Sequence, residues 1–115
     1  MSNLIRDSWK YYKLWMKSDT FSKALNSKIL VTRLAWDHVV RGNKSSPRSF
    51  KDKARRLLIM KESRYVLINA KDFVKTSKDG YIYYELKMKL KKQDIKVIVR
   101  EDRKGSKVLY SWMKK

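Results

Sequence analysis

The sequence predicts an α+β fold in which N-terminal helices pack on one face of a four-stranded antiparallel β-sheet. Apolar residues recur at helical spacings up to about residue 70. After residue 72, apolar and polar side chains alternate, which is the pattern of half-buried strands. Because the helices come first and the strands follow in consecutive hairpins, the order of elements indicates this fold class.

Residues 1–28 are expected to form two helices. The apolar face of the first has spacings of four, three and four residues and consists of Ile5, Trp9, Tyr12 and Met16. A second, shorter helix is predicted after Ser18 or Thr20, with inward-facing residues Phe21, Ala24 and Leu25. The β-branched segment 29–34 fits either a strand or the lead-in to a helical turn at 36–40, and periodicity does not separate the two.

The next helix is predicted to follow a loop at residues 41–49, which holds a glycine and the only proline. Ser49 and Asp52 fit the capping-box pattern, so the helix should begin at residue 50 and extend to about residue 70. Its apolar stripe is predicted to consist of Phe50, Ala54, Leu57, Leu58 and Tyr65.

Four strands are predicted from the two-residue alternation. The longest spans 82–90, its hairpin partner spans 73–76, and two more span 95–99 and 108–112. In the last strand, Val108, Tyr110 and Trp112 are predicted to alternate with Leu109, Ser111 and Met113. Turns are expected at Asp79-Gly80 and Lys104-Gly105.

The length of 115 residues fits a single domain over 1–115, with N-terminal helices at 1–28 and a helix-plus-sheet part at 29–115. The chain has no cysteine and one histidine, which excludes disulfides and argues against a zinc site. No signal peptide and no apolar run long enough to span a membrane is present, so the expected location is the cytoplasm. No cofactor motif is found, and no metal or cofactor is expected.

The charge predicts a polyanionic partner. Thirty Lys and Arg residues face 11 Asp and Glu residues, which gives a formal net charge of +19. Nucleic acid relieves such self-repulsion best, and an acidic membrane surface is the alternative. The predicted contacts are basic residues of loop, helix and sheet together with two tyrosines for base stacking: Lys44, Arg48, Lys51, Arg55, Arg56, Tyr81, Tyr83, Lys87 and Lys89. The two tyrosines would instead be buried if a helix covered their face of the sheet.

His38, the only histidine, is the candidate for chemistry. RNA is cleaved without metal when its 2′-oxygen attacks the adjacent phosphate, which needs a base, an acid and cations on the phosphate. One histidine fills one proton-transfer role, so the other would fall to a tyrosine, a lysine or Glu85. The adjacent Asp37 could hold a protonated imidazole. The alternative is that His38 is a packing residue.

Residues 29–115 resemble the BECR superfamily of metal-independent ribonucleases, which joins barnase, EndoU, colicin-type and RelE-like toxins. The matching features are Trp36-Asp37-His38-Val39, the basic loop from Arg41 to Arg48, the helix that follows, and closing strands at 96–100 and 107–112. The shared core does not account for residues 1–27.

The resemblance implies a BECR-like sheet and a toxin that cleaves RNA, often tRNA, and is held in check by an acidic immunity or antitoxin protein. The cytoplasm would then be that of the host or of a target cell. Carried over by position, the catalytic residues would be His38, Arg41, Arg100, Tyr110 and Ser111.

The predicted function is therefore a metal-independent endoribonuclease that acts by 2′-OH attack. The alternative is a non-catalytic basic protein that binds RNA or DNA, such as a phage or viral accessory protein. A third reading is a basic protein that inhibits an acidic partner protein.

Overall fold

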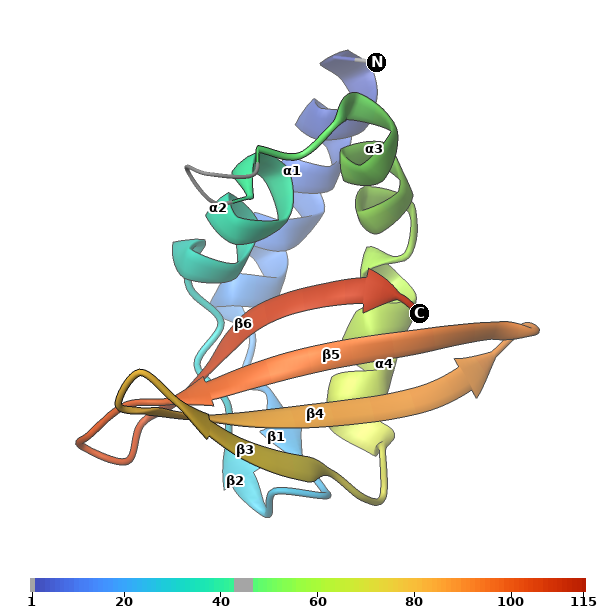
Figure 1. Ribbon diagram of the computed structural model, residues 1–115. Coiled ribbons are helices and arrows are strands. Elements are labelled where there is room, and N and C mark those ends of the chain that lie inside the picture. Colours follow the sequence, from blue (N-terminus) through green and yellow to red (C-terminus); the bar gives the residue numbers. More distant parts are fainter. Residues whose placement is uncertain (1, 43–46) are drawn as a thin grey trace.

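The predicted α+β class is confirmed (Figure 1). The computed structural model describes residues 2–42 and 47–115, so the predicted contact Lys44 lies outside the described residues. The helices are α1 (Ser2–Lys17), α2 (Arg33–Arg41), α3 (Phe50–Leu58) and α4 (Met60–Asn69). The strands are β1 (Phe21–Ser22), β2 (Ser27–Lys28), β3 (Val74–Lys78), β4 (Tyr81–Leu90), β5 (Gln93–Glu101) and β6 (Lys107–Lys114).

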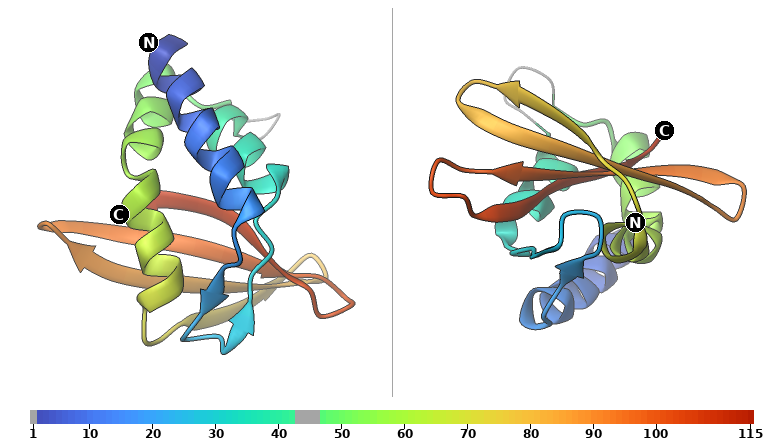
Figure 2. Two further views of the ribbon diagram at one scale, coloured as in Figure 1. Left: turned by 180° about the vertical axis from the view of Figure 1, so that it is seen from behind. Right: turned by 90° about the horizontal axis from the view of Figure 1, so that it is seen from below.

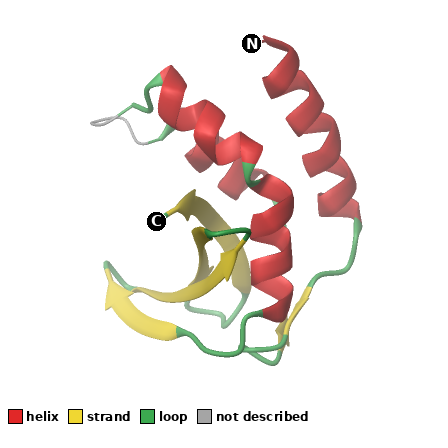
Figure 3. Ribbon diagram, turned by 90° about the vertical axis from the view of Figure 1, so that its right-hand side faces the viewer, coloured by secondary structure: helices red, strands yellow, loops and turns green. Residues whose placement is uncertain are grey.

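The main sheet is an antiparallel meander with the order β3-β4-β5-β6. Helix α4 packs against one face of β4 and β5, while α2 and α3 contact β6 (Figures 1 and 3). The predicted turns are present, with Gly80 at φ 82° and Gly105 at φ 86°, values that glycine adopts without a steric penalty. No helix of the described residues is long and apolar enough to cross a membrane.

Helix α1 forms as predicted, but the predicted second helix is wrong. Residues 21–28 form a hairpin of β1 and β2 instead. The buried side chain is that of Ser22, whose hydroxyl accepts a hydrogen bond from the Leu25 amide at 3.2 Å. Asn26 has φ 48°, a left-handed conformation that asparagine tolerates. Phe21, predicted to face inward, is 51% exposed.

The capping box is confirmed, because the Ser49 hydroxyl accepts a hydrogen bond from the Asp52 amide at 3.2 Å. The helix does not continue to residue 70 without a break. It is interrupted at Ile59, which has φ −106° and ψ 16°, outside helical values. This break lets Ile59, which a straight helix would turn away from Leu57, enter the core together with Leu57 and Met60.

The same break makes part of the predicted apolar stripe wrong. Phe50, Leu58 and Tyr65 are exposed rather than buried, because the two short helices turn different faces to the sheet. Leu57 is buried as predicted.

The inner face of the sheet matches the predicted alternation in β4 and β5. In β6 strict alternation is wrong, because Ile98 pairs with Ser111 whereas Val99 pairs with Leu109. Tyr110 is the extra residue of this β-bulge. The bulge allows Leu109 and Trp112, three positions apart, to be buried together.

Segment 29–34 leads into helix α2 rather than forming a strand of the sheet. Leu30 makes an isolated parallel bridge to Val108, with hydrogen bonds of 2.9 Å from the Leu30 amide to the Lys107 carbonyl and from the Leu109 amide to the Leu30 carbonyl. This bridge ties the start of α2 to β6.

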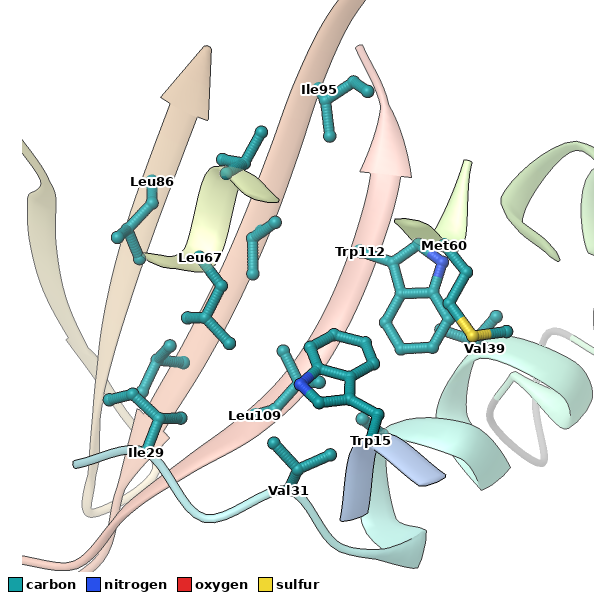
Figure 4. Packing of buried hydrophobic residues seen from close by; sticks show 14 of the residues in the cluster. Trp15, Ile29, Val31, Val39, Met60, Leu67, Leu86, Ile95, Leu109 and Trp112 are labelled. Carbon is teal, nitrogen blue, oxygen red and sulfur yellow. The ribbon is translucent and has the colours of Figure 1, made fainter. Parts of the chain in front are cut away.

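An aromatic cluster joins α1, α2 and β6 in the core. Rings of Tyr12 and Trp112 lie 5.9 Å apart, and those of Tyr12 and Trp36 lie 5.6 Å apart. Figure 4 shows Trp15 and Trp112 next to each other in this core. The Trp112 indole donates to the Arg56 carbonyl at 2.8 Å, which fixes α3 to β6 as well.

Candidate functional site

Helix α2 holds His38 over the outer side of β6. Its first turn is capped by Thr32, whose hydroxyl accepts from the Leu34 amide, and its last turn ends at Gly42, whose amide donates to the His38 carbonyl at 2.9 Å. The Leu30 bridge sets where this short helix begins relative to β6.

The β-bulge brings Tyr110 against His38. The two ring centroids lie 4.4 Å apart with an interplanar angle of 32°. Bulges reorient side chains, and here Tyr110 is placed on the face opposite the buried Leu109. Two residues that are 72 positions apart in the sequence are thereby in direct contact.

Three guanidinium groups surround this pair. The Arg48 Nε donates to the His38 carbonyl at 3.0 Å, and the Arg56 Nη1 donates to the Ser111 hydroxyl and to the Trp112 carbonyl, both at 3.2 Å. The Arg100 guanidinium carbon lies 5.2 Å from the centre of the Tyr110 ring.

One carboxylate orients two of these arginines. Asp52 lies 3.2 Å from Arg48 and 3.4 Å from Arg56, and the side chains of both arginines are only 13% and 12% exposed. Because two arginines share this carboxylate and Arg100 adds a third cation beside Tyr110, the cluster keeps an excess of positive charge, which suits a phosphate.

The environment of His38 keeps its imidazole neutral. Partial burial, followed by the charges of Arg48, Arg56 and Arg100, lowers the pKa of His38 from 6.5 to about 4. The expectation that Asp37 holds a protonated imidazole is wrong, since the Asp37 carboxylate pairs with Arg33 at 3.4 Å. At pH 7 His38 of the free protein is therefore a neutral imidazole, which can act as a general base and not as a general acid.

Aromatic side chains extend the site over the outer face of the sheet. The Tyr83 ring meets the edge of Tyr110 at 5.5 Å, and the Arg100 guanidinium lies 4.2 Å from the centre of the Tyr81 ring. Helix α4 packs on the opposite face, so Tyr81 and Tyr83 stay partly exposed. A groove of about 410 Å³ beside this row is lined by Tyr83 and Tyr110 together with Thr76 and Glu85.

The structure brings together seven of the predicted residues: His38, Arg48, Arg56, Tyr81, Tyr83, Arg100 and Tyr110. Ser111 is adjacent but fully buried, so its hydroxyl supports Arg56 instead of facing solvent. Arg41 is exposed at the end of α2, and none of the described contacts joins it to His38 or Tyr110.

The remaining predicted contacts lie around the site. Lys51 and Arg55 are exposed on α3. Lys87 and Lys89 are exposed on β4, four and six residues beyond Tyr83, which places them about 13 and 20 Å along the strand. They lie outside the cluster, where only an extended ligand would reach them.

Sequence reasoning missed the second role of Asp52, which was assigned only to the helix cap. The available signal was the spacing Arg48-Asp52-Arg56, because residues four apart in a helix, as Asp52 and Arg56 are, lie on one face, and Arg48 lies just before the helix begins. The described residues bring no three His, Asp or Glu side chains together in a group that could hold a metal ion.

Comparisons with family models, with curated proteins and with solved structures found no match to this chain. The site therefore has to be interpreted from its own chemistry. That chemistry is a neutral imidazole, neighbouring tyrosines and clustered guanidinium groups beside an open groove.

Proposed function

We propose that this protein is a metal-independent endoribonuclease of toxin type that cleaves RNA by attack of the 2′-oxygen on the adjacent phosphate. The observation that carries the proposal is the contact between His38 and Tyr110 inside a cluster of arginines. A base, a hydroxyl and an excess of cations are the groups that this reaction requires.

In the proposed mechanism, His38 removes the proton from the 2′-hydroxyl. The 2′-oxygen then bonds to phosphorus, and the bond from phosphorus to the 5′-oxygen breaks. Tyr110 gives its proton to the leaving 5′-oxygen and regains one from the His38 imidazolium through solvent, so protons balance and a 2′,3′-cyclic phosphate remains.

The arginines stabilise the charge that develops on the phosphate. Arg48 and Arg56 are held in place by Asp52, so little reorganisation is needed when the phosphate enters. The bound phosphate also offsets the repulsion between these cations and a protonated imidazole. The phosphate therefore raises the pKa of His38 toward its ordinary value, and this favours transfer of the proton from the 2′-hydroxyl to His38.

The groove between Tyr83 and Tyr110 is the proposed seat of a base next to the cleaved bond. Its volume of about 410 Å³ and the two tyrosine rings in its lining suit a planar base. Stacking on an aromatic side chain contributes roughly 1–3 kcal/mol per base with little sequence preference.

The test is incubation of the purified protein with tRNA and total RNA in the presence of EDTA. We expect cleavage to persist with EDTA, to leave 2′,3′-cyclic phosphate ends, and to stop when the attacking hydroxyl is replaced by 2′-O-methyl. His38→Gln should abolish cleavage while the variant still binds RNA and unfolds at the same temperature. Intact RNA under all conditions, or undiminished cleavage by His38→Gln, would refute the proposal.

A second candidate function is non-catalytic binding of RNA or DNA. The stacking of Arg100 on Tyr81 favours it, because such an aromatic and cationic surface binds nucleic acid without any reaction. Under this alternative, wild type and His38→Gln bind equally and cleave nothing, whereas Arg100→Gln weakens binding.

A further inference from the structure

Helix α1 presents a row of four cations to solvent. Arg6, Lys10, Lys13 and Lys17 follow one another at spacings of four, three and four residues, and all four are exposed. They lie on the side of the helix opposite the fully buried Tyr12 and Trp15. In the view from behind (Figure 2, left), α1 lies in front of the other helices. It therefore lies on the side of the molecule that faces away from the viewer in Figure 1.

This row is unfavourable for the helix that carries it. Like charges three and four residues apart repel each other, and three such neighbouring pairs occur in succession. The only carboxylate on α1 is Asp7, which lies 3.8 Å from Arg6, and the first turn has no acidic residue to complement the helix dipole. A bound polyanion would remove this repulsion.

An aromatic groove borders the row on the side of α2. Trp9 is partly buried there, with the Arg33 guanidinium carbon at 5.6 Å and the Lys13 ammonium at 6.0 Å from its ring. The groove has a volume of about 370 Å³ and is lined by Ile5, Arg6, Trp9, Arg33 and Trp36. Cations next to an accessible tryptophan suit a nucleotide, with its phosphate and its flat ring.

The geometry favours nucleic acid over a membrane surface. A basic amphipathic helix binds a membrane by inserting its apolar face, but most of the apolar face of α1 packs against the core, with Tyr12 and Trp15 fully buried. The helix holds its cations in a straight row of about 16 Å, from the rise of 1.5 Å per residue. A row of cations at fixed spacing suits a phosphate backbone whose own spacing is fixed, as in a base-paired stem.

We propose that the outward face of α1, with Trp9 and Arg33 at its border, is a second RNA-binding surface that holds a base-paired stem outside the cleavage site. The choice of RNA as the polyanion rests on the proposed function. The surface itself shares no residue with the cluster around His38. It would make structured RNA the preferred substrate over short single strands.

The test compares two variants with the same loss of charge. In the first, Arg6, Lys10, Lys13 and Lys17 are all replaced by Gln, which is a similarly good helix former. The matched control replaces four exposed lysines away from both surfaces: Lys71, Lys91, Lys92 and Lys114. The probe is a stem-loop RNA made entirely with 2′-O-methyl nucleotides, so binding is measured without cleavage.

We expect the α1 variant to bind the stem-loop at least ten-fold more weakly at about 100 mM salt, and the slope of log affinity against log salt to fall by about 3. In the control variant, the affinity and the salt slope should each change by only a small fraction of these amounts. Cleavage of a tetranucleotide at saturation should be the same for both variants and wild type.

Equal losses in both variants would overturn the proposal, because net charge alone would then explain them. Undiminished RNA binding by the α1 variant, or loss only of binding to phosphatidylserine vesicles, would overturn it as well. If no RNA is cleaved by any form but α1 still governs stem-loop binding, the proposed function fails while this inference stands.

Discussion

The titration of His38 offers the sharpest test of the site, because the chain has a single histidine and the NMR signals of its imidazole are therefore assigned without ambiguity. We expect a midpoint of about 4 in the free protein, as against 6.5 for an unperturbed histidine. At pH 7 only about one molecule in a thousand would then carry a protonated His38.

Arg100→Gln is the informative perturbation. Arg100 and His38 both lie against Tyr110, at 5.2 and 4.4 Å from its ring centre, so they are no more than about 10 Å apart. Two unit charges at about 10 Å interact by about 0.4 kcal/mol in water and about 1.7 kcal/mol at an effective dielectric constant of 20. The substitution should therefore raise the pKa of His38 by roughly 0.3 to 1.2 units.

The control is Arg103→Gln, which removes an exposed cation from the turn between β5 and β6. It should leave the midpoint nearly unchanged. A wild-type midpoint near 6.5, or equal shifts in both variants, would refute the account of a desolvated imidazole among nearby cations. Addition of a non-cleavable oligonucleotide should raise the wild-type midpoint, and an unchanged midpoint would place the phosphate elsewhere.

Further predictions concern stability, measured by urea unfolding. Arg56→Met should cost about 1–3 kcal/mol, because it leaves buried hydrogen-bond partners unsatisfied, whereas the exposed Arg55→Met should stay within about 0.5 kcal/mol. Tyr12→Phe should cost about 1 kcal/mol, since the buried Tyr12 hydroxyl, whose pKa burial raises, donates to the Thr32 carbonyl, and no loss would show that this bond is dispensable. Between pH 6.5 and about 4 the unfolded chain binds more protons at His38 than the folded one, so the free energy of unfolding should decrease as the pH is lowered through this window, and less so in His38→Gln.

Strands β4 and β5 were predictable from sequence because the apolar alternation in residues 82–99 coincides with one buried face of the sheet. Strand β3 is exposed throughout and was predicted only as the hairpin partner of β4. The hairpin at 21–28 was not predictable, because over so few residues its sequence also fits a helical pattern. Its formation depends on the burial of Ser22 and on the left-handed backbone of Asn26. The break at Ile59 was also hidden, because neither glycine nor proline marks it.

For the site, residue types were predictable and their assembly was not. His38, Arg100 and Tyr110 could be singled out by type and position. Their contact depends on the β-bulge in β6 and on the bridge from Leu30 to Val108, neither of which has a local sequence signal. Ser111 was misjudged for the same reason, because the bulge decides that its hydroxyl is enclosed.

The bridge from Leu30 to Val108 has a consequence for biosynthesis. The bridge attaches the start of α2 to β6, and β6 follows every other part of the site in chain order. A ribosome-bound chain that has emerged only as far as β5 carries His38 and Arg100 without the ring that lies between them. The cluster around His38 is therefore complete only after β6 has been synthesised, so under the proposed function a chain that lacks β6 would cleave no RNA.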